Sequence, residues 1–102
     1  MMALLVKANG EVTTLAPKGR TFEFKGELYE LLATDCIQLL QLFDGRYMLC
    51  DEEAKIRPGE RKPVNPMATR LLWISGGMRD DEILGDVVIC NRKELQNDDD
   101  EH

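Results

Sequence analysis

The sequence contains few of the residues and patterns that catalysis usually needs. Histidine occurs only once, as His102, and catalysis by a Ser-His or Cys-His pair would need that imidazole to be held rigidly by a third group. The phosphate-binding pattern GxxxxGK[ST] is absent, and no GxGxxG opens a helix. We therefore predict that the protein is not an enzyme and that it uses no cofactor.

Cysteine is also sparse and shows no metal-binding spacing. Cys36, Cys50 and Cys90 form no CxxC pair, and a zinc site would need such a pair or an interior histidine. No metal is therefore expected. Three thiols without a disulfide suit a reducing compartment. We predict unpaired cysteines and a cytoplasmic protein.

Long apolar runs are missing as well. The N-terminal run, residues 3–6, is too short for a signal segment or a membrane span, so no membrane partner is expected. Four of the 19 acids lie at 98–101, which leaves 15 acids against 13 bases in the rest of the chain. This nearly neutral body argues against nucleic acid as a partner. We predict a single domain over 1–96 and a disordered acidic tail over 97–102.

What the sequence does contain begins with two hairpin signals. Asn9-Gly10 follows the run at 3–8, and Asp44-Gly45 follows the run at 36–43. Both dipeptides favour two-residue type I′ turns. Turns of this length would set the register of each hairpin. The resulting pairs are Leu4 with Leu15 and Leu40 with Leu49.

Two helices and a fifth strand complete the pattern. Apolar residues at helical spacing predict a short helix over 26–33. Asn65 suits an N-cap and Pro66 the first helical position, and Gly76-Gly77 is a stop signal, so a second helix is predicted between them. The apolar segment 83–90 predicts a largely buried strand.

The predicted order of elements is therefore ββαββαβ. Hairpins separated by helices are typical of an α+β fold. We predict a two-layer sandwich in which a mainly antiparallel sheet carries both helices on one face.

Several acidic residues allow more than one interpretation. Asp86 interrupts the last strand, where it could accept a backbone hydrogen bond, point to solvent at a sheet edge, or line a cleft. Other acids cluster at 51–53 and 80–82. Such clusters can bind Mg²⁺, but a solvated surface is the simpler interpretation.

The start of the second helix is the best candidate for a ligand site. A helix N-terminus attracts anions through its free N–H groups and its dipole. Lys62 precedes this helix and Arg70 lies about one turn into it. We predict that a bound phosphate or sulfate would lie beside Asn65, at the N–H groups of Met67 and Ala68. In the simpler alternative, Asn65 satisfies these groups and Lys62 points to solvent.

A protein interface is the other candidate. The apolar content is high for so small a chain, and an excess of exposed apolar surface marks interaction sites. Trp73 and Leu72 on the second helix, with Tyr47 on the second hairpin, are the residues we expect there. The expected partner is a protein, with self-association as one form of it.

Several short motifs together resemble the family named domain of unknown function 3846. The resemblance spans residues 3–90, and it implies a short cytoplasmic bacterial protein of the kind associated with phages and plasmids. No activity is assigned to the family. The motifs are Leu4-Leu5-Val6-Lys7 with Gly10-Glu11-Val12, Leu42-x-Asp44-Gly45-Arg46, Asp51-Glu52-Glu53, Pro63-Val64-Asn65-Pro66-x-Ala68-Thr69 and Gly85-Asp86-Val87-x-Ile89-Cys90.

Two functional hypotheses follow. The first is a small non-enzymatic binding or adaptor protein that uses the second helix and the second hairpin. The second is a module that binds a small anionic or nucleotide-like ligand at the N-terminus of the second helix. A mimic of DNA is a third hypothesis, which the nearly neutral body argues against.

Overall fold

The residues that the structure describes form five strands and two helices. The computed structural model of the chain describes residues 3–54, 62–77 and 81–95. The predicted tail at 97–102 lies outside these ranges. The α+β class is confirmed; a short turn at Phe24–Leu28 takes up the first residues of the helix predicted over 26–33, and a further turn at Arg92–Glu94 was not predicted. The elements are β1 (Ala3–Val6), β2 (Val12–Leu15), α1 (Tyr29–Leu32), β3 (Ile37–Gln41), β4 (Tyr47–Asp51), α2 (Pro66–Ile74) and β5 (Val87–Cys90).

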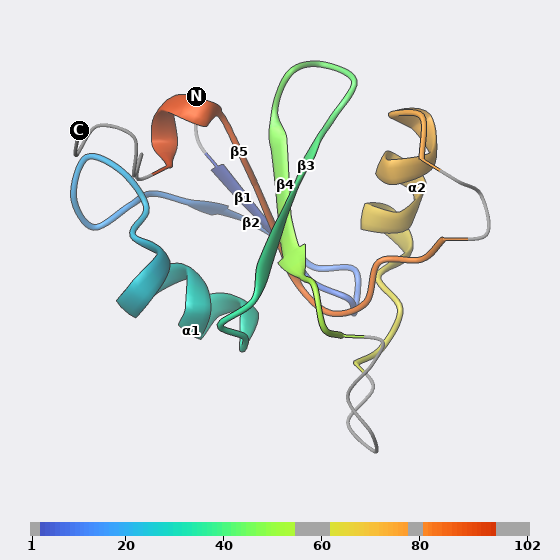
Figure 1. Cartoon of the computed structure of the whole chain (residues 1–102), viewed down its shortest axis with the longest axis horizontal. Helices are drawn as coiled ribbons and strands as arrows, with labels where there is room; N and C mark the ends of the chain where they lie inside the picture. Colours follow the sequence, from blue (N-terminus) through green and yellow to red (C-terminus); the bar gives the residue numbers. More distant parts are fainter. Residues whose placement is uncertain (1–2, 55–61, 78–80, 96–102) are drawn as a thin grey trace.

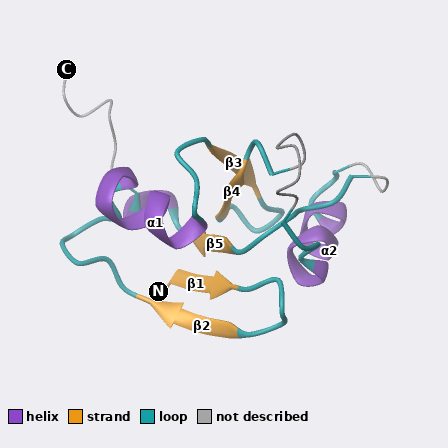
Figure 2. Cartoon of the chain, turned by 90° about the horizontal axis from the view of Figure 1, so that it is seen from below, coloured by secondary structure: helices purple, strands orange, loops and turns teal. Residues whose placement is uncertain are grey.

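The strands form one sheet in the order β2-β1-β5-β4-β3, and every neighbouring pair is antiparallel (Figure 2). β5 therefore lies between the two hairpins, although it comes last in sequence. All four of its residues are buried, as expected for the central strand of a covered sheet. The predicted strand over 83–90 is shortened, because Gly85 adopts a φ of +82° and residues 83–85 lie beside Val64 instead.

The two helices lie on opposite faces of the sheet, so the predicted two-layer sandwich with both helices on one face is wrong (Figure 1). The reason is that β1, β4 and β5 are apolar at successive positions, and successive side chains point to opposite faces. Both faces therefore need a cover. The α1 core contains Ala3, Leu5, Phe22, Leu28, Leu32, Leu49, Val88, Cys90 and Leu95, and the α2 core contains Val6, Leu42, Met48, Cys50, Ala68, Ile83, Val87 and Ile89.

Both hairpins exist, but each is one residue out of the predicted register. Leu4 pairs with Thr14, and Leu40 pairs with Met48. A type I′ turn needs positive φ at both central residues. Here only the glycines have it, with φ of 97° at Gly10 and 89° at Gly45.

Each turn is instead a three-residue loop that ends in a left-handed glycine, the geometry of a type I turn followed by a bulge. The N–H of Gly10 donates to Lys7 O and the N–H of Gly45 donates to Leu42 O, both at 3.0 Å. The extra loop residue accounts for the shift of register in both hairpins.

The helix ends largely agree with the predictions. Asn65 caps α2, Pro66 is its first residue, and Gly76, with a φ of +98°, follows its last turn. The first helix is preceded by a non-helical Gly26, with a φ of +84°, and it closes at Ala33 in a left-handed conformation with a φ of +51°.

Candidate functional site

Asn65 is fully buried, and its backbone and side chain join three parts of the fold. The side-chain oxygen accepts a hydrogen bond from Ala68 N–H at 3.1 Å. The side-chain nitrogen donates to Val6 O at 3.0 Å and to Gly85 O at 2.9 Å. The residue therefore ties the start of α2 to the end of β1 and to the segment before β5. The Ala68 N–H, which was expected to bind an anion, is bonded within the fold.

Lys62 does not reach the start of α2. Its Nζ lies 2.7 Å from Leu32 O, 3.2 Å from Ala33 O and 2.9 Å from Asp51 Oδ2. The last carbonyl groups of a helix have no partner within the helix, so the ammonium group caps the C-terminus of α1. Neither the predicted anion contact nor the predicted exposure to solvent describes this lysine.

Glycine is needed where the Lys62 side chain crosses the segment before β5. A Cβ at position 85 would lie 2.8 Å from Lys62 Cδ, and the φ of Gly85 is +82°. Both the close approach and the left-handed backbone favour glycine. Gly85 thus leaves room for the lysine that caps the C-terminus of α1.

Three of the other residues of the predicted anion site line a shallow hollow. Asn65, Met67 and Arg70 line it, opposite the loop of the first hairpin at 8–10, and its volume is about 340 Å³. Arg70 is exposed on this side of α2. The structure therefore brings Arg70 and Met67 together at the helix start, but not Lys62.

Asp51 lies at the centre of an inner polar cluster. Its side chain is only 1% exposed; Oδ1 accepts hydrogen bonds from Thr34 Oγ1 at 2.8 Å and Glu53 N–H at 3.0 Å, and Oδ2 faces Lys62. Burial alone would raise the pKa of Asp51. The hydrogen bonds from Lys62 and Thr34, with the charge of Lys62, outweigh burial and lower this pKa below its ordinary value. The inner cluster joins the end of β4 to α1.

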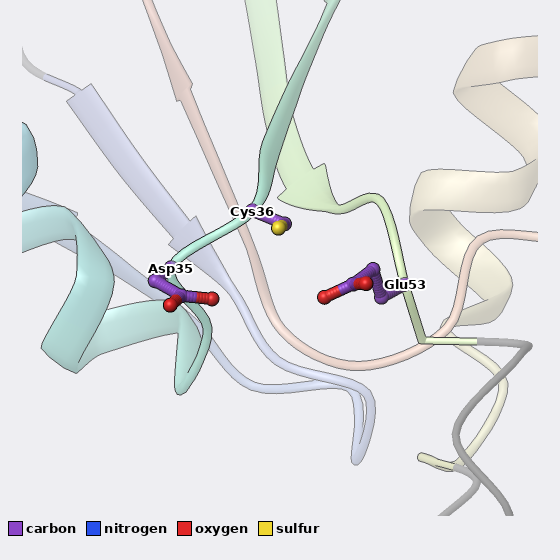
Figure 3. A group of neighbouring side chains, drawn as sticks. All are labelled: Asp35, Cys36 and Glu53. Carbon is purple, nitrogen blue, oxygen red and sulfur yellow. The ribbon is translucent and has the colours of Figure 1, made fainter.

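Asp35, Cys36 and Glu53 form an outer cluster (Figure 3). Asp35 and Cys36 directly precede β3, and Glu53 follows β4. Their ligand atoms all lie within 4.8 Å of one another, so the three residues could hold a metal ion. The hydrogen bond to Glu53, then burial and the charges of both carboxylates, raise the pKa of the Cys36 thiol to about 11. Such a thiol is a poor nucleophile at neutral pH, because the thiolate is the reactive form.

The sequence offered only part of the signal for this outer cluster. The acids at 51–53 are visible in the sequence, but Asp35 and Cys36 approach Glu53 only through the pairing of β3 with β4. Cys36, Cys50 and Cys90 are all thiols in the structure, as predicted.

Asp86 has the first of the three roles considered for it. Its Oδ1 accepts a hydrogen bond from Ala8 N–H at 3.0 Å. The carboxylate therefore fixes the tip of the first hairpin against the turn before β5.

The tip of the second hairpin is hydrogen-bonded to the other end of α2. Phe43 N–H, at the hairpin tip, donates to Ser75 Oγ at 3.0 Å. Phe43 is 64% exposed and Ile74 is 59% exposed, the highest values among the large apolar residues of the described ranges. We use the name hairpin–helix patch for Phe43, at the hairpin tip, together with Ile74 and Ser75, at the end of α2. Figure 1 shows the hairpin tip and the end of α2 side by side at the top.

The three predicted interface residues do not share one surface. Trp73 is 37% exposed, and its Nε1 donates to Asp81 O at 3.0 Å. Leu72 packs against the α2 core, whereas Tyr47 packs against the α1 core on the opposite face of the sheet. Sequence reasoning missed Phe43 because a two-residue turn would have placed it in the strand rather than in the loop.

The helices in the described ranges include none that is long and apolar enough to cross a bilayer. Comparison with known proteins gives no match: no family model, no curated protein and no solved structure matches the chain. The resemblance to the domain of unknown function 3846 family therefore stays a prediction.

Proposed function

We propose that this is a small non-enzymatic cytoplasmic binding protein, whose partner is a protein that contacts the hairpin–helix patch. The observation that carries the proposal is the exposure of Phe43 and Ile74 on two segments joined by the bond from Phe43 N–H to Ser75 Oγ. Full burial of one such side chain stabilises a complex by about 1.5–3 kcal/mol relative to its full exposure. Aromatic side chains such as that of Phe43 are enriched in protein interfaces.

The polar groups of the described residues support binding rather than catalysis. Asn65, Lys62 and Asp51 are engaged in contacts that hold helices and strands together. The raised pKa of Cys36 keeps that thiol protonated at neutral pH. An adaptor role of the phage- or plasmid-associated kind, which the family resemblance implies, agrees with this proposal.

A photo-crosslinking amino acid at position 43 tests the proposal in living cells. Position 12 on the first hairpin is the matched control, because Val12 is also exposed. We expect a discrete crosslinked partner from position 43 but not from position 12, and we expect Ile74→Ser to reduce its yield. Equal crosslinking from both positions, or none from position 43, would contradict the proposal.

Anion binding at the hollow beside α2 is a second candidate. The position of Arg70 and Met67 around that hollow favours it, although Lys62 and Ala68 N–H are engaged elsewhere. Titration with phosphate should then shift the amide NMR signals of residues 67–70, and Arg70→Gln should abolish the shifts. Shifts spread evenly over all lysines and arginines would exclude the site.

A further inference from the structure

The outer edge of β3 presents backbone groups that are not paired within the fold. Leu42 N–H donates to Arg46 O, and Glu52 N–H donates to Cys36 O, so the even-numbered residues of this strand bond to β4. In an antiparallel pair the alternate residues point their N–H and C=O groups away from the partner strand. Ile37, Leu39 and Gln41 therefore face outwards. Within the described part of the chain they make no further backbone bond.

This edge lacks the features that usually prevent strand pairing. Native edge strands carry charges, proline or bulges that block the approach of another strand. β3 has the sequence Ile-Gln-Leu-Leu-Gln, without charge or proline, and it is paired with β4 in continuous register. Neither helix runs along its outer edge (Figure 2). Leu39, at the centre of the strand, is 38% exposed.

The opposite edge of the sheet is less suited to pairing. In β2 the same alternation leaves Val12 and Thr14 facing outwards, because Lys7 N–H donates to Glu11 O. That edge offers two outward residues where β3 offers three, and its side chains are smaller. The two edges are therefore not equivalent as pairing surfaces.

We propose that β3 pairs with β3 of a second copy of this chain, antiparallel, about a twofold axis at Leu39. In this register Leu39 faces the partner's Leu39, and Ile37 faces the partner's Gln41. Each of these pairs exchanges two backbone hydrogen bonds, so all three outward residues are used. The result is a continuous sheet across both copies with an isologous interface.

The charges near the strand ends agree with a second copy as the occupant. The acids that flank β3 are Asp35 and Asp44. In the proposed register Asp35 lies opposite the partner's Phe43, and Asp44 lies opposite the partner's Thr34. No acid faces an acid, so no like-charge repulsion opposes the pairing. The proposed pairing rests on the edge of β3 and not on the hairpin–helix patch, although Phe43 of that patch lies at the end of the paired segment.

Sedimentation velocity of the purified full chain tests this inference. Because a strand-edge interface is small, we expect the mass to rise from monomer towards dimer between about 10 µM and 1 mM. Leu39→Lys places two ammonium groups opposite each other and should weaken the dimer at least about tenfold. The matched change Thr14→Lys, on the other edge strand, should leave it unaltered. A wild-type protein that stays monomeric throughout would overturn the inference, as would a Leu39→Lys protein that dimerises like wild type.

A crosslinking variant tests the register even if Leu39→Lys fails to fold. In a Cys36→Ser background, Leu39→Cys should form a covalent dimer on mild oxidation, because paired Cα atoms about 5.5 Å apart suit a disulfide. Thr14→Cys in the same background is the control. Equal rates of dimer formation at the two positions would contradict the proposed pairing.

Discussion

The two hairpins share one turn geometry but present different tips. Each has a three-residue loop closed by a left-handed glycine, Gly10 or Gly45. The first tip is Ala8-Asn9-Gly10, next to the start of α2, and the second is Phe43-Asp44-Gly45, next to its end. α2 thus extends from one tip to the other. The two loops have the same backbone geometry, but the first tip is polar and the second has an exposed phenyl ring.

The hairpins also differ in how they are tied to α2. β1 is tied to α2 by the buried Asn65 side chain through Val6 O, whereas the second tip is tied to α2 by the exposed bond to Ser75. Folding explains the contacts of the first hairpin. It does not explain the exposed Phe43 or the open edge of β3. On our proposal, the first hairpin therefore has a structural role and the second is where the protein associates.

The largest expected effect comes from Asn65→Ala. The change leaves the carbonyl groups of Val6 and Gly85 and the N–H of Ala68 without their partners, at about 1–3 kcal/mol for each buried group. Urea unfolding should show a loss of about 3 kcal/mol or more. The comparison variant Ser75→Ala, which removes the exposed bond from Phe43 N–H, should lose less than about 1 kcal/mol. Similar losses of stability in the two variants would contradict the proposed difference between the contacts that tie the two hairpins to α2.

Lys62→Met should have the next largest effect, because it removes the positive charge beside the buried carboxylate at the base of the second hairpin. We expect a loss of about 2 kcal/mol at pH 7, since breaking a buried pair leaves one charge uncompensated. Asp51→Asn, which removes that carboxylate charge, serves as the comparison. A Lys62→Met protein as stable as wild type in urea would show that the ion pair of Lys62 with Asp51 does not stabilise the fold.

The pH dependence of stability should report on the same pair. The pKa of Asp51 is lower in the folded state than its ordinary value, so its contribution is present above the unfolded pKa of about 3.9. That contribution is lost as pH falls through the folded pKa. Wild type should therefore lose stability more steeply below about pH 4 than Asp51→Asn does. Parallel curves for the two proteins would contradict this assignment.

The two turn glycines should be equally sensitive to substitution. A Cβ at position 10 or 45 meets no atom within 4 Å, so the cost of Gly→Ala comes from the positive φ alone. We expect each variant to lose about 1 kcal/mol in thermal unfolding. A loss at one position more than twice that at the other would show that the turns are not alike.

The smallest effect on folding is expected from Glu53→Gln, which alters the reactivity of Cys36. The hydrogen bond to Glu53 is the first cause of the raised pKa of about 11. Its weakening should lower this pKa and speed alkylation by iodoacetamide at pH 8 several-fold. Mass spectrometry of the Cys36 peptide measures the rate. Alkylation as slow as in wild type would assign the raised pKa to burial and Asp35 instead.

Local signals in the sequence predicted the elements but not all of their relations. Asn9-Gly10 and Asp44-Gly45 mark hairpins, yet the same dipeptides serve two-residue and three-residue loops, so the register was one residue out. The uninterrupted apolar runs Ala3–Val6 and Val87–Cys90 indicate a sheet covered on both faces. The prediction of both helices on one face did not use this signal.

The candidate sites depended more on distant contacts. Asn65 and Pro66 identify a capped helix because the capping rule is local. The partners of Lys62 lie 11 to 30 positions away in sequence, at Asp51 and Leu32, so no local pattern reveals them. The exposure of Phe43 likewise depends on the loop length that the sequence leaves open.

We propose that the second hairpin, and not the first, is where the protein associates. Amide NMR spectra recorded from about 20 µM to 1 mM test it most directly, because weak association shifts signals only at the contact. We expect concentration-dependent shifts along Ile37–Gln41, with β2 unchanged. Shifts in Val12–Leu15 instead, or spectra that do not change with concentration, would contradict it.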